Sequence, residues 1–261
     1  MIFKASRLPL FLLVTLAAAV GIVTAQDADP ETVLSRAVNF VGGEKYLAIK
    51  TQIGRGRYST IRDGAIVSFQ SFYDVIVFPG RERTEFKGGG ERMVQGNDGE
   101  TAWYYDGASE MVRDQSEEQI ANFDHGVRGG LDTLLRGEWR GHAELKHIGR
   151  RQATLGKRND VLLLTYDDGF AVEFEIADDG TPVKAIRRSV NEAGEETVHE
   201  DRYAQFVDIG GIRAPYIVDR FTNGVHMSRI NFESIQYNRP VADSIFAKPD
   251  SVKSLRKSLE L

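Results

Sequence analysis

The chain has 261 residues, of which 41% are hydrophobic and 27% charged, and its formal net charge is -5. It contains no cysteine, which excludes disulfides, thiolate catalysis and cysteine-ligated metal sites. The mildly acidic balance argues against nucleic-acid binding and against electrostatic binding to anionic lipid headgroups.

The N-terminal segment has the three parts of a secretory signal. Lys4 and Arg7 precede an apolar run over Leu8–Val23, and small residues follow up to Ala25. We therefore predict a signal peptide over residues 1–25 and an exported protein. The run is shorter than the roughly 20 residues of a spanning helix, and an uncleaved anchor is the alternative. A lipoprotein anchor is excluded because it needs a cysteine.

The first predicted element is a helix that begins at Pro30. Asp29 is a favourable N-cap, and proline fits the first helical position. Apolar residues recur at helical spacing up to Val41, and the pair Gly42-Gly43 ends the helix. A short second helical turn is expected over residues 44–49.

From residue 51 onward the pattern changes to the period of two that is typical of strands. Asx-Gly pairs, which favour tight hairpin turns, separate the runs. They are Asp63-Gly64, Asp98-Gly99, Asp106-Gly107, Asp168-Gly169, Asp179-Gly180 and Asn223-Gly224. Within 172–176 the apolar residues alternate with Glu173 and Glu175, which predicts one dry and one solvated sheet face. Consecutive hairpins of this kind predict a single large antiparallel sheet that is curled or partly closed.

One helical insertion interrupts the strands. Residues 116–119 read Ser-Glu-Glu-Gln, a capping box, and an apolar stripe that includes Leu131 and Leu134 follows. We expect these helices to cover the concave face of the sheet as a lid or plug. A weakly amphipathic, peripheral helix is expected over residues 251–261, after a single domain at 26–250.

No catalytic or metal-binding constellation stands out. The five histidines, at 125, 142, 147, 199 and 226, form no metal motif and are expected at the surface or in turns. No serine lies in a nucleophile elbow, and the paired carboxylates fit turns. Gly88-Gly89-Gly90 is interpreted as a bend between strands, and the arginines at 81, 83, 92, 150 and 151 as a solvated face. The sequence predicts no catalytic residue, metal or cofactor.

Apolar side chains crowd the first half of the chain. In the run Phe69–Phe78, one face carries Phe69, Tyr73, Val75 and Val77, and the other carries Phe72, Ile76 and Phe78. Either they form a packed core against the helices, or a half-barrel keeps an apolar cavity. The candidate cavity-lining residues are Phe69, Tyr73, Val75, Val77, Trp103, Leu131, Leu134, Val172 and Phe174.

Three segments resemble the LolA-type superfamily of outer-membrane lipoprotein-sorting proteins. They are AVNFVGGEKYLAIKTQIGRGRY (37–58), GNDGETAWYYDG (96–107) and the closing stretch 210–249 with its Asn-x-Pro and Phe-x-x-Pro motifs. The resemblance implies a mainly β fold, an incomplete antiparallel barrel of about eleven strands, with helices closing a hydrophobic cavity. It also implies a periplasmic, non-enzymatic carrier or chaperone that takes a lipid or the acyl chain of a lipoprotein.

The leading hypothesis is therefore a periplasmic carrier or binding protein for a lipid or acylated ligand, which is not membrane-spanning once the signal is cleaved. The alternative is a cell-envelope interaction module with a packed core and no cavity. A hydrolase is a third reading, which would require His142 and a carboxylate to converge in a cleft. If the insertion helices form a lid, Leu131→Asp or Leu134→Asp should weaken ligand retention while the sheet still folds.

Overall fold

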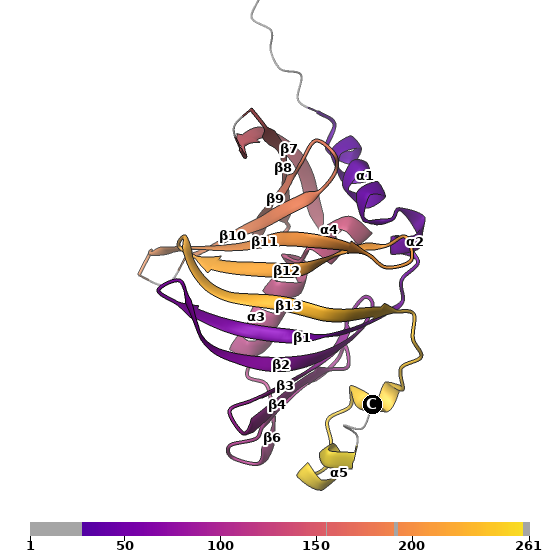
Figure 1. Cartoon of the computed structure of the whole chain (residues 1–261), viewed down its shortest axis with the longest axis vertical. Coiled ribbons are helices and arrows are strands. Elements are labelled where there is room, and N and C mark those ends of the chain that lie inside the picture. The colour runs from indigo at the N-terminus through magenta and orange to yellow at the C-terminus, as the bar shows by residue number, and fades with distance from the viewer. Residues whose placement is uncertain (1–27, 155, 191–192, 258–261) are drawn as a thin grey trace, which may run out of the picture.

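The computed structural model describes residues 28–154, 156–190 and 193–257. The predicted signal peptide, residues 1–25, lies outside the described residues. Figure 1 shows a single curled sheet with helices on one side and the C-terminal segment beside its lower part. Within the described part of the chain, none of the helices has the length and apolar character needed to cross a membrane.

All strands of the described residues belong to one antiparallel sheet of 13 strands. The strands are β1 Thr51–Arg62, β2 Ala65–Val77, β3 Arg81–Gly88, β4 Glu91–Asn97, β5 Ala102–Asp106, β6 Met111–Asp114, β7 Ala143–Gln152, β8 Arg158–Tyr166, β9 Ala171–Ile176, β10 Pro182–Val190, β11 Glu196–Asp208, β12 Arg213–Thr222 and β13 Val225–Tyr237. The helices are α1 Pro30–Val41, α2 Glu44–Leu47, α3 Glu117–Arg128, α4 Leu131–Arg136, the 3-10 helix η1 Asp243–Ile245 and α5 Val252–Lys257.

The sheet curls into an open barrel, and its middle strands come from the two ends of the strand region of the chain. The strand order is β6-β5-β4-β3-β2-β1-β13-β12-β11-β10-β9-β8-β7, so the first strand pairs with the last. Strands β6 and β7 are the free edges, and α3 and α4 connect them along the chain. The predicted fold class is confirmed, with two more strands than the approximate eleven expected.

Helix α1 forms as its sequence predicts. The Asp29 carboxylate accepts a hydrogen bond of 3.0 Å from the Thr32 backbone N–H, and Pro30 is the first helical residue. Gly42 ends the helix at φ +129°, and a Cβ there would lie 2.6 Å from the Gly211 carbonyl oxygen. Conformation and close packing therefore both require glycine at this position.

Cross-strand pairing defines two faces of the sheet, because residues directly opposite each other point to the same side. One unbroken row of partners runs Phe174, Ala185, Asp201, Arg220, Ser228, Thr60 and Ser68. We call the face that carries this row the inner face. In β2 from Ser68 onward it holds the even-numbered residues, including Phe72 and Asp74, and the odd-numbered residues lie on the outer face. Before the bulge at Val67, Ile66 pairs with Ile61 and shares the outer face.

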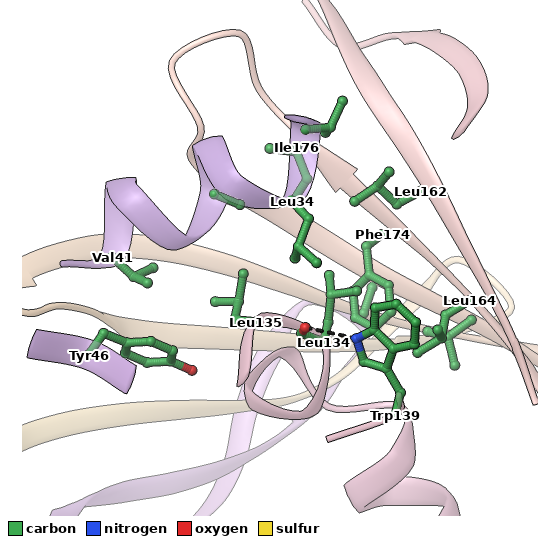
Figure 2. Close-up of a cluster of buried hydrophobic side chains, with 14 of the residues drawn as sticks. Leu34, Val41, Tyr46, Leu134, Leu135, Trp139, Leu162, Leu164, Phe174 and Ile176 are labelled. Atoms are coloured by element: carbon green, nitrogen blue, oxygen red, sulfur yellow. Dashed lines mark hydrogen bonds between the residues drawn. The ribbon is translucent and has the colours of Figure 1, made fainter. Parts of the chain in front are cut away.

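The main core lies on the inner face of β7–β10. Helices α1 and α4 pack there against apolar side chains of β8 and β9, as Figure 2 shows. Leu34, Leu134 and Phe174 are all less than 5% exposed, and the Trp139 indole N–H donates to the Leu134 carbonyl oxygen at 3.0 Å. Burial of each such side chain is worth about 2 kcal/mol, so this cluster anchors α1 and α4 to the sheet.

A second apolar layer lies on the outer face, under the C-terminal segment. Ile245 and Phe246 pack on Val75, while Leu255 of α5 packs on Trp103. Leu255 is only 1% exposed, so the prediction of a merely peripheral C-terminal helix is wrong. The burial of this segment could not be predicted from the sequence, because the strands that it contacts lie far earlier in the chain.

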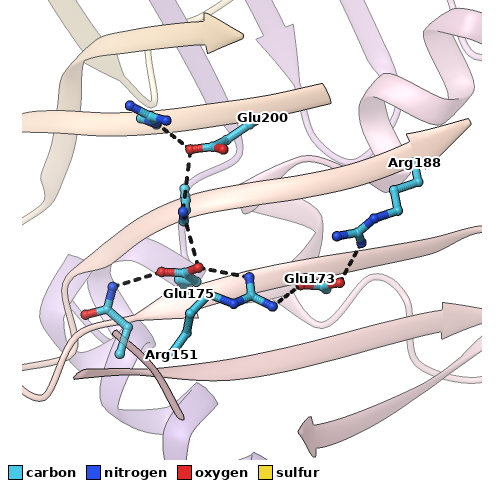
Figure 3. A network of polar contacts seen from close by, with 8 residues as sticks. Arg151, Glu173, Glu175, Arg188 and Glu200 are labelled. Carbon is cyan, nitrogen blue, oxygen red and sulfur yellow. Dashed lines mark hydrogen bonds and ion pairs between the residues drawn. The ribbon is translucent and has the colours of Figure 1, made fainter. Parts of the chain in front are cut away.

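The predicted solvated face of β9 is also wrong at Glu175. Its side chain is 2% exposed on the outer face and pairs with Arg151 at 3.0 Å and Lys184 at 3.3 Å. Asn159 donates a further hydrogen bond of 3.0 Å. Figure 3 shows Arg151 between Glu175 and Glu173, with Arg188 beyond Glu173. A buried carboxylate is tolerated here because cations and an amide surround it.

Candidate ligand-binding site

Helix α3 contacts the sheet at two places, in its middle and at its C-terminal end. Its N-terminus has the predicted capping box: the Gln119 N–H donates to Ser116 Oγ and the Gln119 side chain accepts from the Ser116 N–H. In the middle of the helix, Phe123 lines a small hollow with Glu82 and Gln95. The helix therefore lies against the inner face of β3 and β4.

The other end of α3 is attached to the β8–β9 hairpin. His125 stacks on Phe170 with ring centroids 4.7 Å apart, and Arg128 pairs with Asp168 at 2.7 Å. The Tyr166 hydroxyl donates to the Arg128 carbonyl oxygen at 2.9 Å. Although its middle and its C-terminal end contact the sheet, α3 has no buried residue along its 12 positions. The helix therefore lies over the inner face without being part of the packed core.

Aromatic side chains line the inner face of the central strands. Phe72 of β2 contacts Phe232 of β13 edge to face at 5.3 Å, and Tyr216 of β12 adjoins Phe232 at 6.4 Å. Gly54 and Gly56 of β1 lie opposite this group, and a Cβ on Gly54 would lie 2.8 Å from the Phe232 ring. Glycine in β1 thus makes room for aromatic rings on the inner face.

Two carboxylates share one hydroxyl on the same face. Thr84 Oγ lies 2.9 Å from an Asp74 oxygen and 3.0 Å from a Glu82 oxygen. A threonine hydroxyl has one proton to donate, so it cannot satisfy both carboxylates when both are ionised. Burial, followed by the charge of Glu82, holds the pKa of Asp74 well above its usual range, and burial also raises the pKa of Glu82. The pair therefore tends to retain a proton.

Cations face these carboxylates across the inner face. Asp201 of β11 lies 3.3 Å from Arg187 and 3.7 Å from Arg220. The charge of Arg220 lowers the pKa of Glu82, opposing the effect of burial, so the two groups interact across the curled sheet. The inner face of the central strands is therefore amphipathic: aromatic rings lie beside a row of polar groups from Arg187 to Asp74.

The structure does not bring the nine predicted cavity residues together. Leu131, Leu134, Val172 and Phe174 lie in or against the inner-face core. Tyr73, Val75, Val77 and Trp103 lie on the outer face next to the C-terminal segment, and Phe69 is 60% exposed near the β1–β2 turn. Cross-strand pairs from Val75 through Arg83 and Gly96 to Trp103 confirm the shared outer face. Whether any of the nine contacts a ligand stays a prediction.

The two insertion helices, α3 and α4, differ in how deeply they are buried. Leu134 is 0% exposed and Leu135 is 3% exposed, so α4 is part of the core. Replacing Leu134 by aspartate would place a carboxylate among apolar groups and destabilise the whole sheet, which is not what we expected from the sequence. Only α3 has the loose attachment expected of a lid.

Two further predictions about polar residues are wrong. The His147 side chain is 4% exposed, and its Nε2 lies 3.1 Å from Asp160, which also pairs with Arg36 of α1. Arg83 is 3% exposed under the C-terminal segment. Both residues lie in strands with alternating polar positions, and distant segments cover them. The half-buried Asp74 could have been noticed as an acidic residue inside an apolar strand.

An open hollow of about 500 Å³ lies between α3, α4 and the β8–β9 turn, and His142, Asp167 and Asp168 line it. Its hydroxyl groups are already engaged: Thr133 donates to the Val127 carbonyl oxygen at 2.6 Å, and Tyr166 donates to Arg128. Asp168 is paired with Arg128. Across the described residues, no group of three or more His, Asp or Glu side chains could hold a metal ion.

Comparisons with known proteins identify the fold. No family model matches the sequence, and no curated protein matches it. A LolA superfamily protein from Nitrosomonas europaea superimposes with a TM-score of 0.55 at 14% identity, over 85% of this chain and 98% of the other. A Vibrio parahaemolyticus domain named for outer-membrane lipoprotein sorting gives a TM-score of 0.55 at 11% identity, over 84% and 98%. The predicted resemblance is confirmed at the level of structure: this chain has the LolA-type fold.

Proposed function

We propose that this protein is a periplasmic carrier or binding protein for a lipid or an acylated ligand, held between α3 and the inner face of the central strands. The proposal rests mainly on α3, which spans the inner face while burying none of its residues. A helix that lies over the inner face without burying its own residues leaves room for an apolar guest. The named relatives, a LolA superfamily protein and a lipoprotein-sorting domain, support the same class of ligand.

The energetics of such binding are sufficient without catalytic chemistry. Burial of an acyl chain contributes about 0.8 kcal/mol per methylene, so about ten methylenes correspond to roughly micromolar affinity. The aromatic group around Phe72 and Phe232 offers apolar contact area for the chain. The polar row from Arg187 to Asp74 offers hydrogen bonds to a headgroup, so we expect an amphiphile rather than a hydrocarbon.

Release requires α3 to move away from the inner face. Its two attachments, Phe123 at β3–β4 and the His125 and Arg128 contacts at the β8–β9 hairpin, are small and partly exposed. Helix α4 stays in place as part of the core. We therefore infer that α3 alone acts as the lid, and that the function is transfer rather than catalysis.

Mass spectrometry of organic extracts tests the proposal. The protein is isolated from the periplasm without detergent, extracted and analysed, and uptake of a fluorescent fatty acid is measured on the extracted protein. We expect an amphiphile at near-stoichiometric amount and saturable uptake of the probe. A clean extract together with no uptake would contradict the carrier proposal and favour an envelope interaction module with a packed interior.

A further inference from the structure

Large exposed apolar side chains gather at one end of the sheet. Ile66 is 60% exposed, Val67 53% and Phe69 60%, all in β2 next to the β1–β2 turn. Val225 and Met227, at 57% and 45%, begin β13 at the neighbouring hairpin. Both turns lie at the left of Figure 1, whereas the C-terminal segment lies at the right. The C-terminal segment thus leaves this end of the outer face uncovered.

The β1–β2 and β12–β13 hairpins form one continuous surface, because β1 lies between β2 and β13 in the sheet. Thr60 pairs with Ser68 on one side and with Ser228 on the other, so the start of β2 and the start of β13 flank the end of β1. Bulges in β2 at Val67 and in β13 at Met227 interrupt the regular register. We call the exposed apolar residues Ile66, Val67, Phe69 and Met227 the hairpin surface.

A cation-lined pocket adjoins the hairpin surface on the outer face. It has a volume of about 300 Å³, and its lining includes the outer-face residues Arg55, Ser71, Tyr73, Arg83, Glu85 and Lys87. Three of these side chains are basic and one is acidic, which makes the lining charge +2 (three minus one) in a chain whose net charge is -5. Ser71 is two residues from Phe69, or about 7 Å along the strand.

Glu85 does not neutralise all the basic side chains of the pocket. Glu85 already pairs with Arg92 at 2.5 Å and with Lys87 at 3.0 Å. Arg55 stacks on the Tyr73 ring at 4.7 Å, and among the described residues no carboxylate lies within ion-pair distance of it. Arg83 donates one hydrogen bond of 2.9 Å to the Ile245 carbonyl oxygen, while its buried Nη2 has no partner in the described chain. The positive charge of the pocket is therefore available to bind an anion.

Exposed apolar side chains beside a cation-lined pocket are a combination that suits a membrane surface. In a peripheral protein, apolar groups enter about 5–10 Å into the boundary between headgroups and acyl chains, and cations remain at the level of the phosphates. Arg57 is a further basic residue beside the hairpin surface, because its guanidinium lies 5.5 Å from the Phe69 ring centroid. Its pairing with Glu233 is exposed on both sides and contributes little.

We propose that the hairpin surface and the cation-lined pocket together dock the protein onto an anionic phospholipid membrane, with a lipid phosphate in the pocket. Binding is local, so it is compatible with a chain whose overall charge is negative. This proposal goes beyond the carrier function and does not depend on a ligand under α3.

Vesicle flotation tests the docking proposal. Purified protein is mixed with vesicles that contain phosphatidylglycerol and phosphatidylcholine in equal parts, or phosphatidylcholine alone. We compare the wild type with Val67→Ser/Phe69→Ser and with Arg55→Gln/Lys87→Gln. The matched controls are Leu47→Ser/Val207→Ser, which removes exposed apolar groups elsewhere, and Lys50→Gln/Lys253→Gln, which removes the same charge. Circular dichroism verifies that each variant is folded.

The expected result is binding to phosphatidylglycerol vesicles that falls about tenfold in either test variant, stays unchanged in both controls, and weakens at high salt. Equal binding by wild type and both test variants would overturn the proposal. Binding of inorganic phosphate that needs Arg55 and Lys87, without vesicle binding, would also overturn it in favour of a soluble anion site. Organic extracts of the same variants report the α3 ligand separately, so the two proposals fail independently.

Discussion

The indole N–H of Trp103 donates a hydrogen bond of 2.7 Å to the carbonyl oxygen of Phe246, which lies 143 residues later in the chain. Both side chains are 0% exposed. This bond ties the C-terminal segment to the outer face of β5, directly beside the Phe246 contact with Val75. The segment is therefore a structural part of the sheet that completes the outer face.

Replacement of Phe246 by alanine should destabilise the protein by about 3–5 kcal/mol, because it empties a buried aromatic site. Phe69→Ala, at a ring that is 60% exposed, should change the free energy of unfolding by less than about 0.5 kcal/mol. Urea denaturation of both variants measures the difference. Similar stability of the two variants would show that the C-terminal segment is not held by this contact.

The lid hypothesis predicts a difference between two residues of α3. Phe123 faces the inner side of β3 and β4, whereas Ile120 is 44% exposed. Phe123→Asp should weaken retention of a bound fatty-acid probe by about tenfold or more, since it removes an apolar contact and adds a charge. Ile120→Asp is the control and should retain the probe normally. Dissociation rates measured by fluorescence decide between them, and normal retention by a folded Phe123→Asp protein would remove the lid hypothesis.

The carboxylate pair of the inner face predicts a pH dependence of stability. Because the pKa of Asp74 is raised in the folded state, the fold binds a proton that the unfolded chain releases at lower pH. Its stabilising contribution is full below the unfolded pKa, about 4, and is lost as the pH rises through the folded pKa. Asp74→Asn should therefore be more stable than the wild type near neutral pH, and this gain should shrink toward about pH 4.

Urea denaturation across this pH range provides the measurement for Asp74→Asn. Asp63→Asn, in the exposed β1–β2 turn, is the matched control and should follow the wild type at every pH. A gain in stability that is the same at acid and neutral pH would contradict retention of a proton by the pair.

The buried charge on the outer face predicts a large effect at one glutamate. Glu175→Ala leaves Arg151, Lys184 and Asn159 without their shared acceptor and should cost about 3–5 kcal/mol. Glu144→Ala, on the exposed edge strand β7, removes a solvent-exposed pair with Lys146 and should cost less than about 1 kcal/mol. Thermal unfolding of the two variants checks the contrast, which would be absent if the Figure 3 network were only a surface feature.

Much of the secondary structure was predictable because its causes are local. The Asp29 cap, the Ser116 capping box and the Asp63-Gly64 turn each depend on residues within four positions of one another. The residue alternation in β2 also divided its two faces correctly, because successive side chains of a strand point to opposite sides. The candidate site was less predictable, since the sequence could not say which of these faces the helices cover.

The sequence by itself therefore determined the helix ends, the hairpin turns and the antiparallel character of the sheet, through short-range hydrogen bonds and backbone preferences. Only the tertiary structure decided which side chains are buried. Glu175 and His147 were expected to face solvent, yet side chains of neighbouring strands surround them. The C-terminal helix was expected to be peripheral, yet its Leu255 is buried against Trp103. The tertiary structure also places Phe174 and Val75 on opposite faces of the sheet. Burial of a residue depends on what packs against it from elsewhere in the chain, and the local sequence pattern does not identify that partner.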